Sequence, residues 1–487
     1  MLLKALTRLD FAAGCQILNA SLARIGYYTH MWVWLLALSL ATGVAAAQDA
    51  AAMGARARQY LVDLIRLDTT NPPGNETRVA QYLKRVADQE GIPCELLSGD
   101  PTRMNFVARL KGSGSHRPLM LMAHSDVVPA DPTQWSVGPF TGEIREGFIY
   151  GRGAQDDKSL LAAELAVLVE LKRRAVPLAR GVILLSEADE EEGSTGIQWM
   201  IQNAWPKINA EFAVNEGGFA MDVPSGPRLF QVQTTEKIPT RAILTAHGSA
   251  GHGSLPRPDN PVVRLARAIT RIADTEQPVR LNTTTRRYFA AMAKLNEYAW
   301  LAPLLPKLGN EQSAASVVAQ IRGRDPELDA QLHTTISPTM LSAGMKINVI
   351  PNTAQGQLDI RRLPNETRQE VLARLRRIIN DPAIDVAPAP GQEMPATEPS
   401  SLTTALYKKM EEVFQASAPG AEVIPYMQRG ATDGSFLRQK GMAVYGIPAF
   451  LREDRVSRAH GNDERISVKS LEAGTKLLWD VVLAVSR

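Results

Sequence analysis

The sequence has little cysteine and no excess of charge of one sign. Cys15 and Cys94 are the only cysteines among 487 residues, too few for a disulfide scaffold or for a zinc site built from thiolates. Any metal ion must therefore be held by His, Asp and Glu side chains. The 54 basic and 51 acidic residues give a formal net charge of +3, which provides no single-signed field to attract nucleic acid.

An apolar segment lies near the N-terminus, where residues 32–42 read WVWLLALSLAT. This segment has the length of the hydrophobic part of an export signal and is shorter than the roughly 20 residues that span a bilayer. Three alanines, 45–47, supply a small-residue cleavage site. We therefore expect residues 1–47 to be a signal peptide and the mature protein to be periplasmic or secreted. Two alternatives stay open: an uncleaved membrane anchor, and a start of translation at Met31 instead of Met1.

The length exceeds one compact domain and predicts two or three. Short apolar runs at 119–123, 182–186 and 211–214 predict buried strands. The long apolar run 160–171 predicts a helix that covers them. This alternation of strands and helices is typical of an α/β fold with a central sheet flanked by helices.

From about residue 237 the pattern changes to that of a smaller α+β unit. The predicted elements are a strand at 241–246, a helix at 261–273, a strand pair at 345–350 and 355–361, and a helix at 367–379. This order predicts an inserted lid, which a Pro-rich stretch connects back to the first domain. We expect a catalytic domain formed by 48–236 and 398–487, and a lid formed by 237–397. The pattern of residues 275–340 predicts no clear role.

Acidic residues and histidines follow the ends of several predicted elements. His124 and Asp126 end the strand at 119–123 on the same face, and a metal-bound imidazole usually donates its second N–H to such a carboxylate. Further acidic or histidine segments are Asp156-Asp157, Glu187 to Glu192, Glu216, and His460. Each alone fits a helix cap or a solvated turn. Together they predict a site where cations neutralise converging carboxylates.

Three ordered motifs resemble the dinuclear-zinc amidohydrolase family of aminoacylase, acetylornithine deacetylase, succinyl-diaminopimelate desuccinylase and glutamate carboxypeptidase. They read HSDVVP at 124–129, GRGAQDDK at 151–158 and DEEEGSTG at 189–196. The similarity runs from about Thr69 to the C-terminus. It implies a zinc-peptidase-like catalytic domain with an inserted ferredoxin-like lid that also serves for dimerisation. Asn215 departs from the family pattern, because relatives often have Asp before the Glu-Gly pair.

The resemblance implies two Zn²⁺ ions per subunit and a role for each motif residue. The implied metal ligands are His124, Asp156 as the bridging carboxylate, Glu191, Glu216 and His460. Glu190 would be the general base, and Asp126 would orient His124. Because all these ligands are nitrogen or oxygen donors, Co²⁺ or Mn²⁺ could replace zinc.

Three residues of the lid resemble substrate-contacting positions of the family. His252, in a Gly-His-Gly motif, would stabilise the oxyanion, and in dimeric members the neighbouring subunit supplies this histidine. Asn348 and Arg361 would hold polar groups of the substrate, and an arginine fork suits a carboxylate. The alternatives are strand-end hydrogen bonding for Asn348 and an ion pair with Asp359 for Arg361. The sequence leaves open whether the protein forms a homodimer through the lid.

These features predict an exported zinc-dependent hydrolase that cleaves an amide bond next to a free carboxylate. Its partner would be a small peptide, for a carboxypeptidase, or an N-acyl amino acid, for an amidohydrolase. We expect no binding of nucleic acid. We expect association with a membrane only if the N-terminal segment is retained. The alternatives are an inactive family member that acts as a binding module, and a biosynthetic deacetylase, which the export segment opposes.

Overall fold

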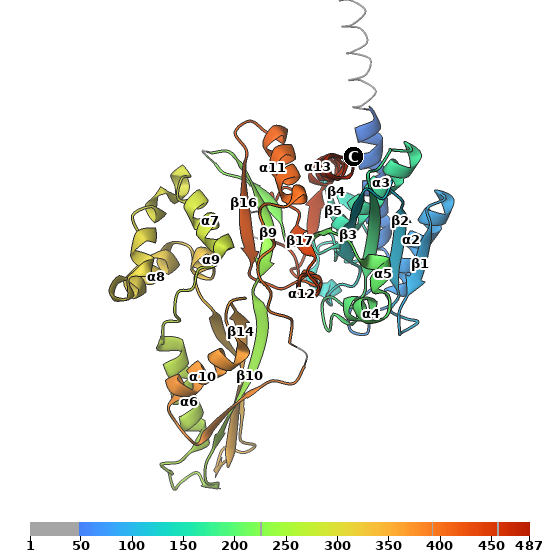
Figure 1. The fold of residues 1–487 in the computed structure, drawn as a ribbon. Coiled ribbons are helices and arrows are strands. Elements are labelled where there is room, and N and C mark those ends of the chain that lie inside the picture. The colour runs from blue at the N-terminus through green and yellow to red at the C-terminus, as the bar shows by residue number, and fades with distance from the viewer. Residues whose placement is uncertain (1–47, 225, 392, 455–456) are drawn as a thin grey trace, which may run out of the picture.

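The computed structural model describes residues 48–224, 226–391, 393–454 and 457–487. The predicted signal peptide therefore lies outside the described residues. A larger domain built on a nine-stranded sheet carries a projecting arm built on a four-stranded sheet (Figure 1). Within the described parts of the chain, no helix is long and apolar enough to cross a membrane.

A mixed sheet forms the centre of the larger domain. Its strands, in spatial order, are β1 (Cys94–Leu97), β2 (Asn105–Leu110), β6 (Arg180–Glu187), β3 (His116–His124), β7 (Phe212–Asn215), β17 (Ala443–Gly446), β9 (Arg228–Glu236) and β16 (Glu422–Gln428), with β8 (Phe219–Asp222) paired to β9. The three buried strands predicted from apolar runs correspond to β3, β6 and β7. Strand β3 runs parallel to both of its neighbours, so these three strands end at the same side of the sheet.

Alternate residues of the central strands pack against helices on opposite faces of this sheet. Leu119 and Leu121 face one core, whereas Met120 and Met122 face the other. The helices of the first core are α2 (Thr77–Gln89), α3 (Lys158–Arg173), α11 (Ala405–Ser417) and α13 (Val468–Ser486). Those of the second are α4 (Thr195–Asn203), α5 (Trp205–Ile208) and α12 (Gly434–Gln439). A sheet covered on both sides needs apolar residues at every position, which explains the continuous runs in the sequence.

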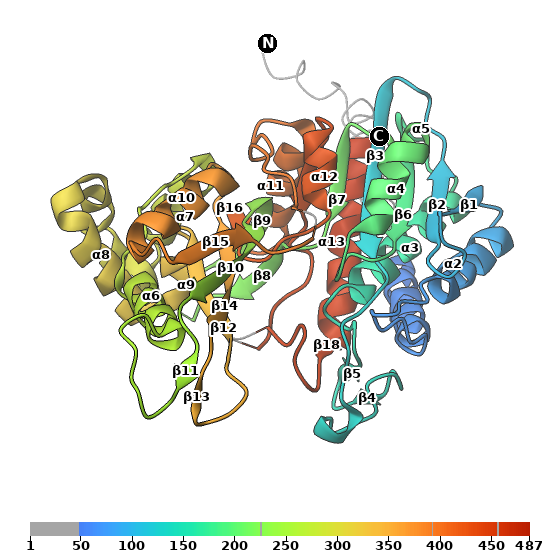
Figure 2. The ribbon, with the colours of Figure 1, turned by 90° about the horizontal axis from the view of Figure 1, so that it is seen from below.

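The projecting arm, which we call the lid, has the predicted ferredoxin-like arrangement. Its chain order is β10 (Ile238–His247), α6 (Pro261–Asp274), β12 (Thr335–Ala343), β14 (Thr353–Arg362), α10 (Arg368–Ile379) and β15 (Ile384–Pro388). The strands are antiparallel in the order β12-β14-β10-β15. Both helices pack on one face of this sheet through a separate apolar core. Figure 2 shows the lid beside the larger domain.

The strand predicted at 345–350 is wrong in its position. Strand β14 pairs with β12 and β10, and only β13 (Val349–Ile350) lies within the predicted range, paired with β11 (Gly251–His252). Met345 and Ile347 are fully exposed, so their apolar side chains do not mark a strand of the lid sheet. Strand β12 was missed because most of its residues are exposed on both faces, which removes the alternation that marks a half-buried strand.

The segment without a predicted role packs on the edge of the large sheet. It contains α7 (Thr283–Met292), η2 (Asn296–Leu301), η3 (Leu305–Gly309), α8 (Glu311–Arg324) and α9 (Pro326–Asp329). Tyr288 and Phe289 of α7 share an apolar core with Leu229 of β9 and Tyr426 of β16. This segment therefore extends the larger domain, although its ends connect to elements of the lid.

We expect Phe414→Ala to destabilise the larger domain. Phe414 of α11 is fully buried and stacks on Phe230 of β9, with ring centroids 4.7 Å apart. Removing the ring leaves a cavity that costs about 3–5 kcal/mol. Urea unfolding should show a lower transition midpoint for this variant. The control Ile144→Ala, at a half-exposed position, should shift the midpoint little, and equal shifts for the two variants would contradict the assignment.

Candidate metal centre

Three neighbouring strands of the large sheet end side by side at the predicted site. Strand β3 ends at His124, β6 ends at Glu187 and β7 ends at Asn215. The carboxyl ends of parallel strands are where ligands bind in open α/β sheets. Glu190 follows β6 and Glu216 follows β7, so both carboxylates reach the same place as His124.

His124 is held in one orientation by Asp126. Its Nδ1 lies 3.0 Å from the backbone carbonyl oxygen of Asp126 and 3.5 Å from Asp126 Oδ1. Because a carbonyl oxygen can only accept a hydrogen bond, Nδ1 carries the proton and donates it. The other nitrogen, Nε2, faces Asp156 Oδ1 at 2.9 Å. Asp126 thus lies where a residue that orients the imidazole must lie.

The carboxylate of Asp156 lies between two imidazoles. Its Oδ1 faces His124, and its Oδ2 lies 3.3 Å from His460 Nε2, which is also 3.1 Å from Glu191 Oε1. Burial alone would raise the pKa of Asp156, but the hydrogen bonds from the two histidines hold that pKa below its usual range. A carboxylate with one oxygen directed at each imidazole has the placement that a bridging ligand requires.

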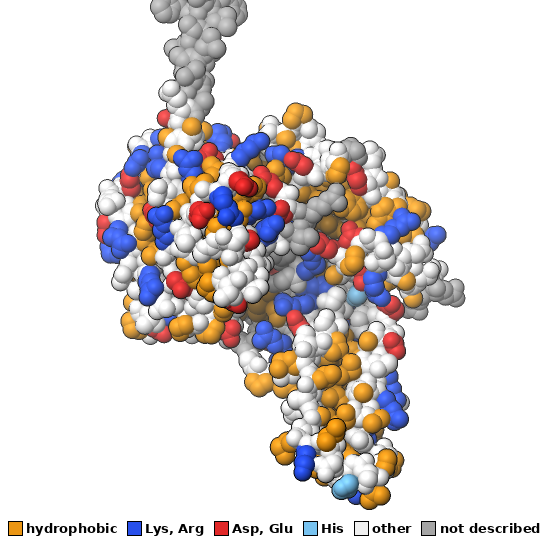
Figure 3. Space-filling model, turned by 180° about the vertical axis from the view of Figure 1, so that it is seen from behind, with side chains coloured by type: hydrophobic (Ala, Val, Ile, Leu, Met, Phe, Trp, Pro, Cys, Tyr) orange, Lys and Arg blue, Asp and Glu red, His pale blue; other side chains and the backbone are white. Residues whose placement is uncertain are grey.

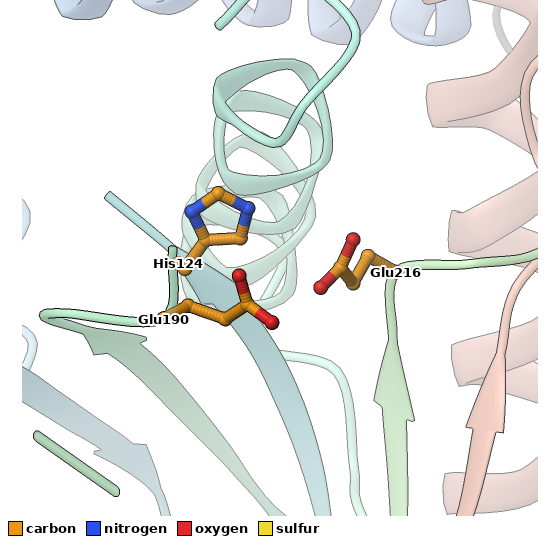
Figure 4. Close-up of side chains that lie close together, drawn as sticks. All are labelled: His124, Glu190 and Glu216. Carbon is orange, nitrogen blue, oxygen red and sulfur yellow. The ribbon is translucent and has the colours of Figure 1, made fainter. Parts of the chain in front are cut away.

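The atoms able to hold a metal ion form two overlapping groups, each within 4.8 Å. One contains His124, Glu190 and Glu216, and the other contains His124, Asp156 and Glu191. Figure 4 shows the first group, in which the carboxylates of Glu190 and Glu216 lie beside the imidazole. The fold therefore gathers the predicted ligands and the predicted general base from five separate segments into one cluster.

The cluster concentrates negative charge where there is little water. Burial, and then the charge of Glu216, raises the pKa of Glu190 well above its usual range. Burial, and then the charge of Asp156, does the same to the pKa of Glu216. Bound cations would neutralise these carboxylates and remove the cost. Because the donors are nitrogen and oxygen atoms, the residues present fit a pair of divalent ions such as Zn²⁺, Co²⁺ or Mn²⁺.

Asp126 is fixed in turn by residues distant in sequence. Asn71 Nδ2 donates to Asp126 Oδ2 at 2.8 Å and to Asp189 Oδ1 at 2.9 Å. The backbone N–H groups of Glu190 and Glu191 each donate to the Asp126 carboxylate at 3.1 Å. Asn71 is not predicted from the sequence, because it lies in an Asn-Pro-Pro-Gly segment whose residue types are those of any turn.

The loop that carries Asp156 is wrapped around a buried carboxylate. Glu464 has no exposed surface, and Arg152 donates to its Oε2 at 2.6 Å. Three backbone N–H groups also donate to Glu464, those of Gly153, Gln155 and Asp156, at 3.2, 2.7 and 3.1 Å. Because Glu464 comes four residues after His460, it joins two loops that carry candidate ligands. Its position in a polar stretch gives no sign of this role.

The predicted lid residues do not lie at this cluster in the single chain. His252 is exposed, its Nδ1 is 2.7 Å from Ser254 Oγ, and Asn348 lies beside it, because the N–H of Gly253 donates to the Asn348 carbonyl. Figure 2 shows β11 and β13 at the far end of the lid. Arg361 on β14 pairs with Asp359 at 3.1 Å, as in the alternative reading. The roles of these residues in catalysis remain predictions.

We expect Glu464→Gln to weaken metal binding about 10- to 100-fold, the usual effect of losing a residue that supports a ligand. The amide presents an NH₂ group to backbone N–H donors, so the Asp156 loop loses acceptors. The dissociation constant of Zn²⁺ can be measured by competition with a chromogenic chelator. The control is Glu366→Gln, which alters a buried, Arg374-paired carboxylate in the lid. Equal zinc affinity in wild type and Glu464→Gln would show that Glu464 serves stability alone.

The chain is similar in sequence to a family of peptidases and to an N-fatty-acyl-amino acid synthase/hydrolase. A model of "Peptidase family M20/M25/M40" matches residues 120–484. The human "N-fatty-acyl-amino acid synthase/hydrolase PM20D1" is 30% identical over 376 residues, which are 76% of this chain and 74% of the relative.

Two solved structures share the fold. The M20 family metallo-carboxypeptidase Sso-CP2 from Sulfolobus solfataricus is 22% identical, with a TM-score of 0.66 over 87% of this chain and 98% of that chain. Human carnosine dipeptidase 1 is 16% identical, with a TM-score of 0.64 over 90% of this chain and 97% of that chain. With three quarters of its length matched by the family model, the chain belongs to the peptidase family M20/M25/M40 and is a hydrolase that acts on amide bonds.

Proposed function

We propose that this chain is an exported two-metal hydrolase that cleaves an amide bond next to a free carboxylate. The observation that carries the proposal is the carboxylate of Asp156, which faces His124 with one oxygen and His460 with the other. His124 and Glu216 would hold one ion, and Glu191 and His460 the other. Export rests on the apolar segment and the alanines of residues 1–47.

In this proposal Glu190 is the general base and general acid of the reaction. When bound, the two ions would polarise the scissile carbonyl and lower the pKa of a water molecule to about 7. A carboxylate oxygen of Glu190 lies within 4.8 Å of ligand atoms of His124 and Glu216, so Glu190 would accept the proton of that water. It would then return the proton to the leaving amine. General acid–base catalysis of this kind typically contributes about 10²–10⁴-fold to the rate.

The apolar lining of a pocket beside the cluster favours a substrate that carries an apolar group. It is bordered by Asp156 and Glu216, and its apolar lining consists of Phe148, Leu160, Phe219, Ile447, Phe450, Leu451 and Ile466. The human relative is named for N-fatty-acyl amino acids, whereas the Sulfolobus enzyme is a carboxypeptidase. We therefore propose an N-acyl amino acid with an apolar acyl chain as the preferred substrate, and C-terminal dipeptides as the second candidate.

The substrate class is tested by comparing N-acyl amino acids of increasing chain length with dipeptides, using protein loaded with Zn²⁺, Co²⁺ or Mn²⁺ and protein treated with a chelator. Hydrolysis should require metal and increase with acyl chain length. Activity that survives complete removal of metal would contradict the two-metal proposal. Binding of these compounds without turnover in any metal-loaded form would favour the binding-module alternative.

We expect Glu190→Gln to abolish turnover while both metal ions are retained, because the amide cannot accept a proton and the variant removes no proposed ligand. Metal content and rate should be measured on the same preparation. Glu192→Gln is the control, since Glu192 is an exposed neighbour, and this variant should keep its activity. Near-native activity of Glu190→Gln would refute its role as the base. Loss of metal would mean that Glu190 is a ligand.

We also propose that two copies of the chain form a dimer through their lids. Strand β12 is an edge strand of the lid sheet, and its Met340 and Leu341 side chains are exposed, as are Val262 and Val263 of α6. Figure 3 shows hydrophobic side chains along the projecting lid. An exposed, apolar edge strand favours pairing with another strand, and an isologous pair of β12 strands would form a closed dimer. Such a dimer could bring His252 of one copy to the cluster of the other.

We expect His252→Ala to lower kcat about 10²- to 10³-fold with metal retained, the usual cost of losing an oxyanion donor. His247→Ala is the matched control, because His247 is also an exposed histidine of the lid. Mixing His252→Ala subunits with Glu190→Gln subunits should restore activity if the histidine acts across a dimer. An unchanged kcat in His252→Ala would refute the role, and a lack of restoration would place the histidine in the same chain as its cluster.

A further inference from the structure

The end of the lid presents apolar side chains to solvent. We call residues 251–257 and 344–350, which contain β11 and β13, the lid tip. Met345 and Ile347 of this tip are fully exposed, and Val349 is 47% exposed. Figure 3 shows hydrophobic side chains gathered at this end of the molecule. Several exposed apolar side chains on two paired segments mark a site of interaction.

The apolar side chains of the tip have a fixed place relative to His252. In the antiparallel pair of β11 and β13, His252 lies directly opposite Val349. Side chains of opposite residues project from the same face, with Cβ atoms about 4.5–5.5 Å apart. The N–H of Gly253 also donates to the carbonyl oxygen of Asn348 at 2.8 Å, which holds the two segments together beyond β11. Wherever His252 binds, Val349 therefore lies beside it.

The pocket beside the metal cluster is too small to enclose a long acyl chain. Its volume is about 150 Å³. An apolar cavity of about 150 Å³ holds a molecule of the size of benzene, with about six carbon atoms. A decanoyl chain would therefore extend beyond the pocket. Because burial of one methylene group changes an affinity about fourfold, a further apolar cover would strengthen the binding of the longer chain.

The lid tip of another copy of the chain has the properties that this cover requires. The described residues that line the pocket include none from the tip of the same chain, and Figure 2 shows β11 and β13 at the far end of the lid. The tip carries the exposed bases Arg257 and Lys346, whereas Glu453 and Asp454 border the pocket. The two surfaces are thus complementary in charge. Strand β12, the proposed dimer contact, ends two residues before Met345.

We propose that the lid tip of a second copy completes the acyl-binding site, and that Met345 and Ile347 cover the part of the chain that extends from the pocket. This inference rests on the proposed function and its dimer, and it names the residues that select chain length. When His252 binds the carbonyl oxygen of the scissile amide, Val349 lies near the carbonyl carbon, to which the acyl chain is bonded. Ile347 is two residues from Val349, so their Cα atoms are at most about 7 Å apart.

The test compares the N-acetyl, N-hexanoyl and N-decanoyl derivatives of phenylalanine on metal-loaded protein. The double variant Met345→Ser/Ile347→Ser should lower kcat/KM for the decanoyl compound about 10-fold, the effect of exposing one or two methylene groups, and leave the acetyl compound unchanged. His252→Ala should instead lower kcat for every compound alike. Ile144→Ser, at an exposed apolar position outside the lid, is the control and should not alter the profile. An equal loss for every compound in the double variant would overturn the inference.

Mixed dimers show which copy supplies the tip. When His252→Ala chains are combined with Glu190→Gln chains, the only cluster that keeps its base belongs to the His252→Ala chain, and the intact histidine comes from the other chain. Adding the double substitution to the Glu190→Gln chain should remove the preference for the decanoyl compound. Adding it to the His252→Ala chain should not. The opposite result, or a mixture without activity, would overturn the inference.

Binding to the metal-loaded Glu190→Gln protein provides a measurement that does not depend on turnover. Calorimetry should show that the decanoyl compound binds more tightly than the hexanoyl compound, and that the double substitution removes this gain. Equal binding of the two compounds without the double substitution, or a gain that survives it, would overturn the inference. Failure of the metal-loaded wild type to hydrolyse any of the compounds, with this pattern of binding intact, would refute the proposed function and leave the role of the tip standing. Melting temperature and sedimentation confirm the fold and the oligomeric state of each variant.

Discussion

Carboxylates that converge at the end of a buried sheet repel one another, and the rest of the site is arranged around this constraint. Asp156 relieves part of the repulsion by accepting hydrogen bonds from both His124 and His460. Glu190 and Glu216 keep a raised pKa, because burial and neighbouring charges oppose their ionisation. Divalent cations would remove the remaining cost, so the same electrostatics that makes the cluster unfavourable alone favours metal binding.

The side chains of the cluster are fixed by a second layer of contacts. Asn71 and the backbone after β6 hold Asp126, which orients His124. Glu464 holds the loop that positions Asp156. Both supports come from segments far from the residues they fix, so the precision of the site depends on the whole larger domain and not on any one motif. The lid has a separate apolar core, and its exposed edge strand and tip take no part in these contacts.

Sequence patterns predicted the strands that are buried on both faces of the sheet. The apolar runs of β3, β6 and β7 are buried on both faces, so their composition alone identified them. The same reasoning failed at residues 345–350, where Met345 and Ile347 are apolar but exposed. It also missed β12, an edge strand whose exposed side chains give no alternation. In both cases the residues that lie nearby in space decide whether a segment forms a strand of the sheet. These neighbours cannot be identified from a local sequence pattern.

By itself, the sequence determined the kinds of ligand available, because two cysteines exclude thiolate sites and leave His, Asp and Glu. Its motifs also determined the family and the order of the ligand-bearing segments. Only the tertiary structure decided that Asp156 lies between two imidazoles and that Glu464 is a support and not a solvated acid. These contacts join segments more than 300 residues apart in the sequence. They depend on how the segments pack in space, which the order of residues does not specify.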